Sequence, residues 1–325
     1  MITVLLYTRP EDQGVDELRA LLASLEAEVP HRLVEVDVSQ NPTLAAKLEG
    51  RTPMLKIGPY TLTGTLDRTR VLVALQAASQ GKAQGRAVEP RQVTGSDRFL
   101  HWFSRHWLLV FNVVVGLYVG LAFLAPVLMK VGWERPAKII YRGYSFTCHQ
   151  LAFRSWFLFG EQPAYPRAAA HVSGLVPYGQ ATGLDENDLL QARAFIGNDK
   201  IGYKVAMCER DVAIYGGILL FGLLFGLFRC KLPPLPWYWW LILGWLPIGL
   251  DGFSQLLSQI PHSPLPYRES TPLLRTVTGF LFGFTTAWFG YPLVEESMQE
   301  SRKALEARFY IADQVAQQAI QDDKG

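Results

Sequence analysis

The chain has 325 residues, of which 49% are hydrophobic and 18% are charged. Its formal net charge of +2 excludes a nucleic-acid-binding protein, because that function needs a concentrated basic face. Three cysteines are too few to build a disulfide scaffold. The length fits two domains, and hydropathy separates them, since four stretches long enough to cross a bilayer begin at Trp107 and later.

The first 80 residues predict a small α/β domain. Ile2–Tyr7 is a run of strand-forming residues, and residues 12–25 repeat apolar side chains at helical spacing. Asn41 and Pro42 are residue types that cap and begin a helix. The predicted order is β-α-β-α-β-β-α, over residues 2–7, 12–25, 31–38, 41–48, 54–57, 60–63 and 66–78.

This domain resembles the glutaredoxin-like branch of the thioredoxin fold. Thr52-Pro53 before a strand is similar to the cis-proline corner of that fold, and Tyr7–Pro10 is similar to the segment leading into its Cys-x-x-Cys motif. The two cysteines of that motif would fall at Asp12 and Val15. Because a thiolate is the nucleophile of thiol–disulfide exchange, we expect a redox-inactive domain, residues 1–80, that docks a cytoplasmic protein partner.

The rest of the chain predicts an all-α membrane domain over residues 98–294. A polar segment without periodicity, residues 81–97, links it to the first domain. Each apolar stretch is close to the ~20 residues that cross a hydrocarbon core of ~30 Å. The four predicted spans cover residues 107–129, 212–228, 237–257 and 272–294.

Positive residues set the predicted orientation. Arg98 and Arg105 precede the first span, Arg229 and Lys231 lie in the short loop before the third, and a basic group follows the fourth. With four spans these places share one side, so we expect a multi-pass cell-membrane protein with cytoplasmic N- and C-termini. The absence of a basic region and cleavage site at the start agrees with a cytoplasmic N-terminus.

Residues 130–211 then form an outer loop, which we expect to be structured. Residues 139–159 have the aromatic and apolar content of a helix that lies on or dips into the membrane, and residues 185–195 predict a short capped helix. After the fourth span, residues 295–325 carry an amphipathic helix and tail. The apolar face of that helix predicts packing on the first domain, on the membrane surface, or on a second copy in a homodimer.

Several motifs in the membrane domain resemble a widespread family of uncharacterised predicted membrane proteins, a domain of unknown function. These are Cys-His-Gln at 148–150 followed by Arg-Ser at 154–155, Cys-x-Arg-Asp at 208–211, and Asp-Gly-x-x-Gln at 251–255, with a fitting stretch at 274–279. The similarity covers about residues 105–292. The resemblance supplies no reaction, because the family has none assigned.

Ionisable side chains gather near the predicted outer ends of the spans. An ionisable group inside a bilayer costs about 2.5–3.5 kcal/mol on insertion scales, so Asp251 needs a partner, for which Arg275 and Arg210 are candidates. A buried structural ion pair explains Asp251 and Arg275 as well as a functional site does. The predicted intramembrane polar site comprises Arg210, Asp211, Asp251, Gln255, Glu269 and Arg275.

Cys148, His149 and Cys208 have three interpretations. The two cysteines can form a structural disulfide in an oxidising compartment. The three residues can instead hold a metal ion, for which zinc suits the ligand types and copper or haem iron are weaker candidates. The cysteines can also form a redox pair that exchanges electrons across the membrane. Candidates for a fourth metal ligand are Asp211, Glu209 and His171.

The sequence therefore predicts an α+β multi-domain protein, with an N-terminal thioredoxin-like α/β domain followed by an all-α four-helix transmembrane domain. We expect a non-catalytic or accessory protein of the lipid bilayer that carries an outer-side Cys/His site. The alternative is an intramembrane enzyme or carrier that acts on a lipid or ion. Its acting residues would be Asp251, Gln255, Arg210 and Arg275.

Overall fold

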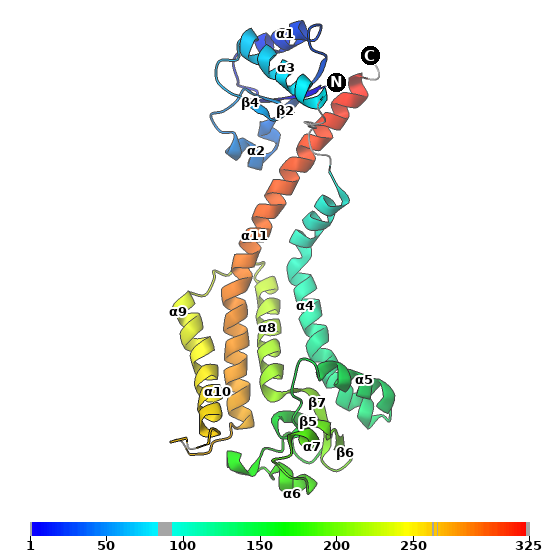
Figure 1. Cartoon of the computed structure of the whole chain (residues 1–325), viewed down its shortest axis with the longest axis vertical. Helices are drawn as coiled ribbons and strands as arrows, with labels where there is room; N and C mark the ends of the chain where they lie inside the picture. Colours follow the sequence, from blue (N-terminus) through cyan, green and yellow to red (C-terminus); the bar gives the residue numbers. More distant parts are fainter. Residues whose placement is uncertain (1, 84–92, 262, 265, 323–325) are drawn as a thin grey trace. The chain divides into compact units, whose positions relative to one another are not determined.

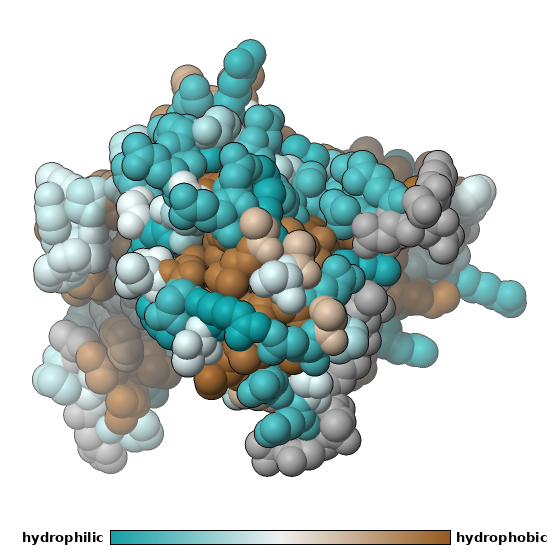
Figure 2. Space-filling model, turned by 90° about the horizontal axis from the view of Figure 1, so that it is seen from above, coloured by the Kyte–Doolittle hydropathy of each residue, from teal (hydrophilic) through white to brown (hydrophobic). Residues whose placement is uncertain are grey.

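A computed structural model describes residues 2–83, 93–261, 263–264 and 266–322 (Figure 1). The chain divides into two compact units. The first unit joins residues 1–105 to residues 297–325, and the second comprises residues 106–296. Most of the predicted linker, residues 84–92, lies outside the described residues. In the view from above, hydrophilic residues surround a hydrophobic area (Figure 2).

The first unit contains a four-stranded sheet in the order β2-β1-β3-β4. β1 pairs in parallel with β2 and antiparallel with β3, which forms a hairpin with β4. The peptide bond between Thr52 and Pro53, just before β3, is cis. The elements are β1 (Ile2–Thr8), α1 (Val15–Leu25), β2 (His31–Asp37), a 3-10 turn η1 (Val38–Gln40), α2 (Pro42–Lys47), β3 (Met54–Ile57), β4 (Tyr60–Leu62) and α3 (Arg68–Ala83).

Two apolar layers cover the faces of this sheet. Successive strand side chains point to opposite faces, so Leu6 packs with α1 and α3 while Tyr7 belongs to the other layer. The last part of α11 (Pro272–Asp322) completes the second layer, where Ala307 is buried. The Tyr310 hydroxyl also donates to the Asp37 carbonyl oxygen at 2.9 Å. The predicted amphipathic helix therefore packs on the sheet, which was one of its three expected positions.

Among the described residues, four helices are long and apolar enough to cross a membrane, in agreement with the four predicted spans. The helix of the first span begins at Gly95, before the predicted span, and the fourth span continues through Pro292 into the amphipathic helix. The third contains a π-helical segment, η4 (Trp240–Trp245). The spans lie in α4 (Gly95–Lys130), α8 (Glu209–Leu227), α9 (Trp237–Trp239) with α10 (Leu246–Ser258), and α11.

Glycines allow α8 and α11 to approach each other closely. A Cβ atom at Gly217 would lie 2.8 Å from the carbonyl oxygen of Phe280. A Cβ atom at Gly279 would lie 2.7 Å from the carbonyl oxygen of Arg210. Real Cβ atoms do not approach other atoms so closely, so small residues are needed at this crossing. The contact places the first turn of α8 against the beginning of α11.

The loop between the first and second spans is a folded layer, and the prediction of a helix over residues 139–159 is wrong. α5 ends at Tyr144 because the following residues turn back into a strand of a three-stranded sheet, β5-β7-β6. Aromatic residues of this segment fill a core with other loop residues, as Phe153 and Phe157 do. The inter-span loop comprises α5 (Glu134–Tyr144), η2 (Ala152–Arg154), β5 (Ser155–Leu158), η3 (Ala168–Ala170), α6 (Tyr178–Thr182), α7 (Leu189–Ala194), β6 (Gly197–Asn198) and β7 (Gly202–Cys208).

Candidate functional site

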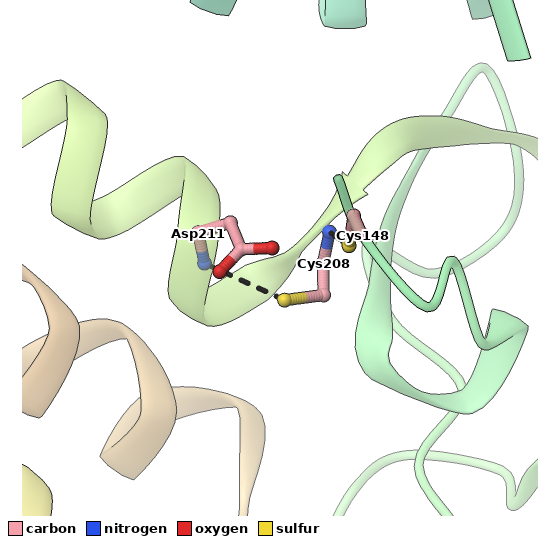
Figure 3. A group of neighbouring side chains, drawn as sticks. All are labelled: Cys148, Cys208 and Asp211. Atoms are coloured by element: carbon pink, nitrogen blue, oxygen red, sulfur yellow. Dashed lines mark hydrogen bonds between the residues drawn. The ribbon is translucent and has the colours of Figure 1, made fainter. Parts of the chain in front are cut away.

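Two cysteines 60 residues apart meet where the inter-span loop joins α8. Cys148 lies in the turn after α5, and Cys208 is the last residue of β7 and the N-cap of α8. The structure has no disulfide bond between these two cysteines. Their Sγ atoms and a carboxylate oxygen of Asp211 all lie within 4.8 Å of one another (Figure 3). We call Cys148, Cys208 and Asp211 the thiol site.

Backbone amides and the helix end favour negative charge on these sulfur atoms. The Cys208 N–H donates to Cys148 Sγ at 3.2 Å, and the Asp211 N–H donates to Cys208 Sγ at 3.5 Å. The N-terminus of a helix carries partial positive charge. A hydrogen bond from the Cys208 thiol lowers the pKa of Cys148, and the same bond together with burial raises the pKa of Cys208. Each sulfur atom therefore has a backbone N–H donor that would stabilise negative charge on it.

A buried lysine holds the Cys-His-Gln turn in place. Lys204 on β7 donates from Nζ to the carbonyl oxygens of Gln150 and Arg193, both at 2.7 Å. Burial lowers the pKa of Lys204 to about 7. The Gln150 side chain donates in turn to the carbonyl oxygen of Tyr141 at 2.8 Å. The glutamine of this motif thus has a positioning role, because it ties the turn to α5.

Neither of the histidines that the sequence offers as ligands, His149 and His171, is part of the thiol site. The side chain of His149 is exposed although its neighbours Cys148 and Gln150 are buried. His171 is also exposed, and its backbone is left-handed with φ 48°. Of the fourth ligands considered from the sequence, only Asp211 belongs to the group that the structure brings together among the described residues.

A second polar site surrounds Asp251 on α10. Asp251 is 4% exposed, and its carboxylate accepts hydrogen bonds from Arg210, from Arg268 Nη2 at 2.8 Å and from Ser270 Oγ at 2.8 Å. Arg268 also donates to the Asp251 carbonyl oxygen at 3.1 Å. Of the two partners considered from the sequence, Asp251 pairs with Arg210, whereas Arg275 pairs with other carboxylates.

The buried carboxylate of Glu269 organises the neighbouring half of this site. It pairs with Arg275, which also approaches Glu209 Oε2 at 3.4 Å. Gln255, one turn along α10 from Asp251, donates to Glu269 Oε1 at 3.0 Å. The further arginines on Glu269 are Arg154 at 2.9 Å and Arg167 at 3.5 Å, both from the inter-span loop.

We call these eight charged residues the arginine cluster. Sequence reasoning missed three of its arginines, because their partners are distant in the sequence. A local signal existed, since Arg154 follows the Cys-His-Gln motif and Arg268 precedes Glu269 at the start of a span. The cluster contains Arg154, Arg167, Arg210, Arg268 and Arg275 with Glu209, Asp251 and Glu269.

Comparison with known proteins agrees with a membrane location. A family model described as "Predicted membrane protein (DUF2085)" matches residues 191–289. A protein of Methanocaldococcus jannaschii, named "Uncharacterized protein MJ1492", is 27% identical over 207 residues, which cover 62% of this chain and 99% of that protein. No solved structure matches the chain. The family match includes Cys208, Asp211 and most of the arginine cluster, but begins after Cys148.

The chain is therefore a membrane protein with four candidate spans among its described residues, and the family and the relative that it resembles have names that state no activity. The family match, residues 191–289, lies within the second unit, so the first unit lies outside it. Inference about function consequently depends on the chemistry of the thiol site and of the arginine cluster.

Proposed function

We propose that this membrane protein binds a divalent metal ion of the zinc class at the thiol site. The observation that carries the proposal is the carboxylate of Asp211 beside two thiols, within 4.8 Å. Each of the three groups becomes anionic when it ionises, so they repel one another unless a cation lies between them. Thiolate and carboxylate ligands both occur at zinc, and three protein ligands leave a fourth position for water.

The dimensions of the site support this assignment. With zinc–sulfur bonds of about 2.3 Å, two ligand atoms of a tetrahedral ion lie about 3.8 Å apart, so donors within 4.8 Å need only a small contraction. Hydrogen bonds from backbone amides to both sulfur atoms stabilise thiolates, as outer-shell donors do in metal sites. The bound ion would fasten the inter-span loop to the first turn of α8.

A disulfide between Cys148 and Cys208 is the second candidate. The proximity of their sulfur atoms and the shortage of other cysteines favour it. A disulfide would not involve the Asp211 carboxylate, whereas a metal ion would be bound by all three groups. We therefore prefer the metal and treat the disulfide as the competing outcome of the test.

The proposal also includes an orientation and a role for the first unit. Arg98, Arg105, Arg229 and Lys231 would place both termini in the cytoplasm and the thiol site on the outer side. The sheet order and the covering helices support a thioredoxin-like domain. With Asp12 and Val15 in place of the catalytic cysteines, that domain would dock a protein partner without redox chemistry.

Metal content and free thiols, measured on the full chain purified in detergent, test the proposal. We expect one equivalent of metal and three free thiols after denaturation without reductant. Cys148→Ser and Cys208→Ser should lose the metal, while Cys230→Ser, at the far end of α8, should keep it. His149→Ala should also keep it, because that side chain is exposed.

One free thiol and no metal in the unsubstituted protein would establish the disulfide instead. Retention of metal in both Cys148→Ser and Cys208→Ser would show that the ion binds elsewhere. Asp211→Asn separates the two candidates further, since it should weaken metal binding but would leave a disulfide intact.

A further inference from the structure

Positive charge exceeds negative charge in the arginine cluster. Five guanidinium groups surround three carboxylates, which leaves two positive charges without a partner charge in the cluster. A structural network of buried ion pairs needs balanced charge, because an uncompensated buried charge is costly. The excess therefore indicates an anionic ligand.

Some guanidinium groups have donors available for such a ligand. The buried Nε of Arg210 has no hydrogen-bond acceptor among the residues that the structure describes. The side chains of Arg154 and Arg268 remain 29% and 36% exposed, so part of each guanidinium is accessible from outside the cluster. Planar guanidinium groups bind phosphate through paired hydrogen bonds, which makes phosphate the fitting anion.

An apolar groove of about 470 Å³ begins one turn away from these arginines. Ala213 and Gly216 of α8 form one side, three and six residues beyond Arg210. On α11, Thr276 follows Arg275 and also lines the groove. Its hydroxyl donates to the carbonyl oxygen of Pro272 at 2.8 Å, so it offers the groove no free donor. The remaining lining residues of the groove are Val277, Phe280 and Leu281.

The groove and the cluster together match one class of molecule. Both helices are candidate membrane spans, so hydrocarbon chains are the surrounding medium of the groove. We propose that the arginine cluster binds the phosphate of an anionic phospholipid, one of whose acyl chains lies in the groove between α8 and α11. A phospholipid supplies the negative charge that the cluster lacks and the apolar chain that the groove accepts.

Lipid binding by the full chain in detergent tests this proposal, with native mass spectrometry as the readout. The probes are dioleoylphosphatidylglycerol, dioleoylphosphatidylcholine and inorganic phosphate. We expect phosphatidylglycerol to bind about tenfold more tightly than phosphatidylcholine, whose choline group repels the arginines. Inorganic phosphate should not compete at equal concentration, because it has no chain for the groove.

Two variants separate the contributions of charge and groove. Arg154→Gln combined with Arg167→Gln removes the two excess charges and should weaken phosphatidylglycerol binding about tenfold. Gly216→Leu should fill the groove and weaken phosphatidylglycerol binding about tenfold. The helix can accept the larger side chain, since a Cβ at Gly216 meets no atom within 4 Å. Gly120→Leu on α4 is the matched control, because that position is equally open, and it should bind as the unsubstituted protein does.

Equal affinity for the two lipids would overturn the proposal, even if the arginine variant fails to fold. Unchanged binding in Gly216→Leu, together with effective competition by inorganic phosphate, would also overturn it in favour of a free phosphate ligand. Metal content is expected to stay at its normal value in Gly216→Leu, so failure here is distinguishable from failure of the metal proposal.

Discussion

Replacement of Asp251 by Asn should strongly destabilise the second unit. The substitution keeps the shape of the side chain but removes the charge that faces Arg210 and Arg268. Removing one partner of a buried ion pair costs about 3–5 kcal/mol. The two arginines are 24% and 36% exposed, so water offsets part of this cost. We therefore expect a loss of about 2–4 kcal/mol in the free energy of unfolding.

Unfolding by sodium dodecyl sulfate in mixed micelles, followed by tryptophan fluorescence, measures this loss. All nine tryptophans lie at Trp102 or later, so the signal reports mainly the second unit. Asp199→Asn is the control, because the Asp199 side chain is 83% exposed and forms a surface ion pair with Lys130 at 3.3 Å. That variant should change stability by less than about 0.5 kcal/mol. An equally small effect of Asp251→Asn would refute the assignment of Asp251 as the buried centre of the cluster.

Three further predictions concern packing, a buried amine and the C-terminal helix. Gly283→Ala should lower the free energy of unfolding by about 1–3 kcal/mol in the same assay, because the added Cβ would collide with a backbone oxygen of α8. Gly290→Ala is the control and should not destabilise the protein, because a Cβ at Gly290 meets no atom within 4 Å. Since burial lowers the folded-state pKa of Lys204 to about 7, the unfolded state binds more protons above that pH, and stability should rise between pH 7 and about pH 10. Lys204→Met should abolish that rise in stability. An equal rise with pH in the variant would show that other groups cause it. Ile311→Asp should speed amide hydrogen exchange in the last part of α11, since Ile311 packs on the sheet, while the exposed Gln317→Asp should not; equal rates would contradict that packing.

The local sequence pattern predicts those helices and strands whose apolar residues recur with a single period. The spans are long apolar runs, and the strands and helices of the first unit alternate at periods of two or 3.6 residues. The inter-span loop lacked such a signal. Gly202–Cys208 is buried on both faces, so its strand has no alternation. The aromatic content of residues 139–159 suits a membrane surface as well as the folded core that it forms.

The composition of the candidate sites is likewise only partly predictable from local sequence. The residue types of Cys148, Cys208 and Asp251 indicate candidate sites, but which groups meet depends on contacts between distant segments. Pairing of Glu269 with Arg154 spans 115 residues, and no local spacing indicates it. His149 adjoins Cys148 in sequence yet is exposed, because adjacent residues of a turn point in different directions.

X-ray absorption at the zinc K-edge, on the full chain loaded with one equivalent of zinc, tests the central claim most directly. The account predicts two sulfur ligands at about 2.3 Å and two oxygen or nitrogen ligands at about 2.0–2.2 Å, with the sulfur signal lost in Cys148→Ser combined with Cys208→Ser. A spectrum with only oxygen and nitrogen ligands, or a protein that retains no zinc while its thiols are free, would contradict it.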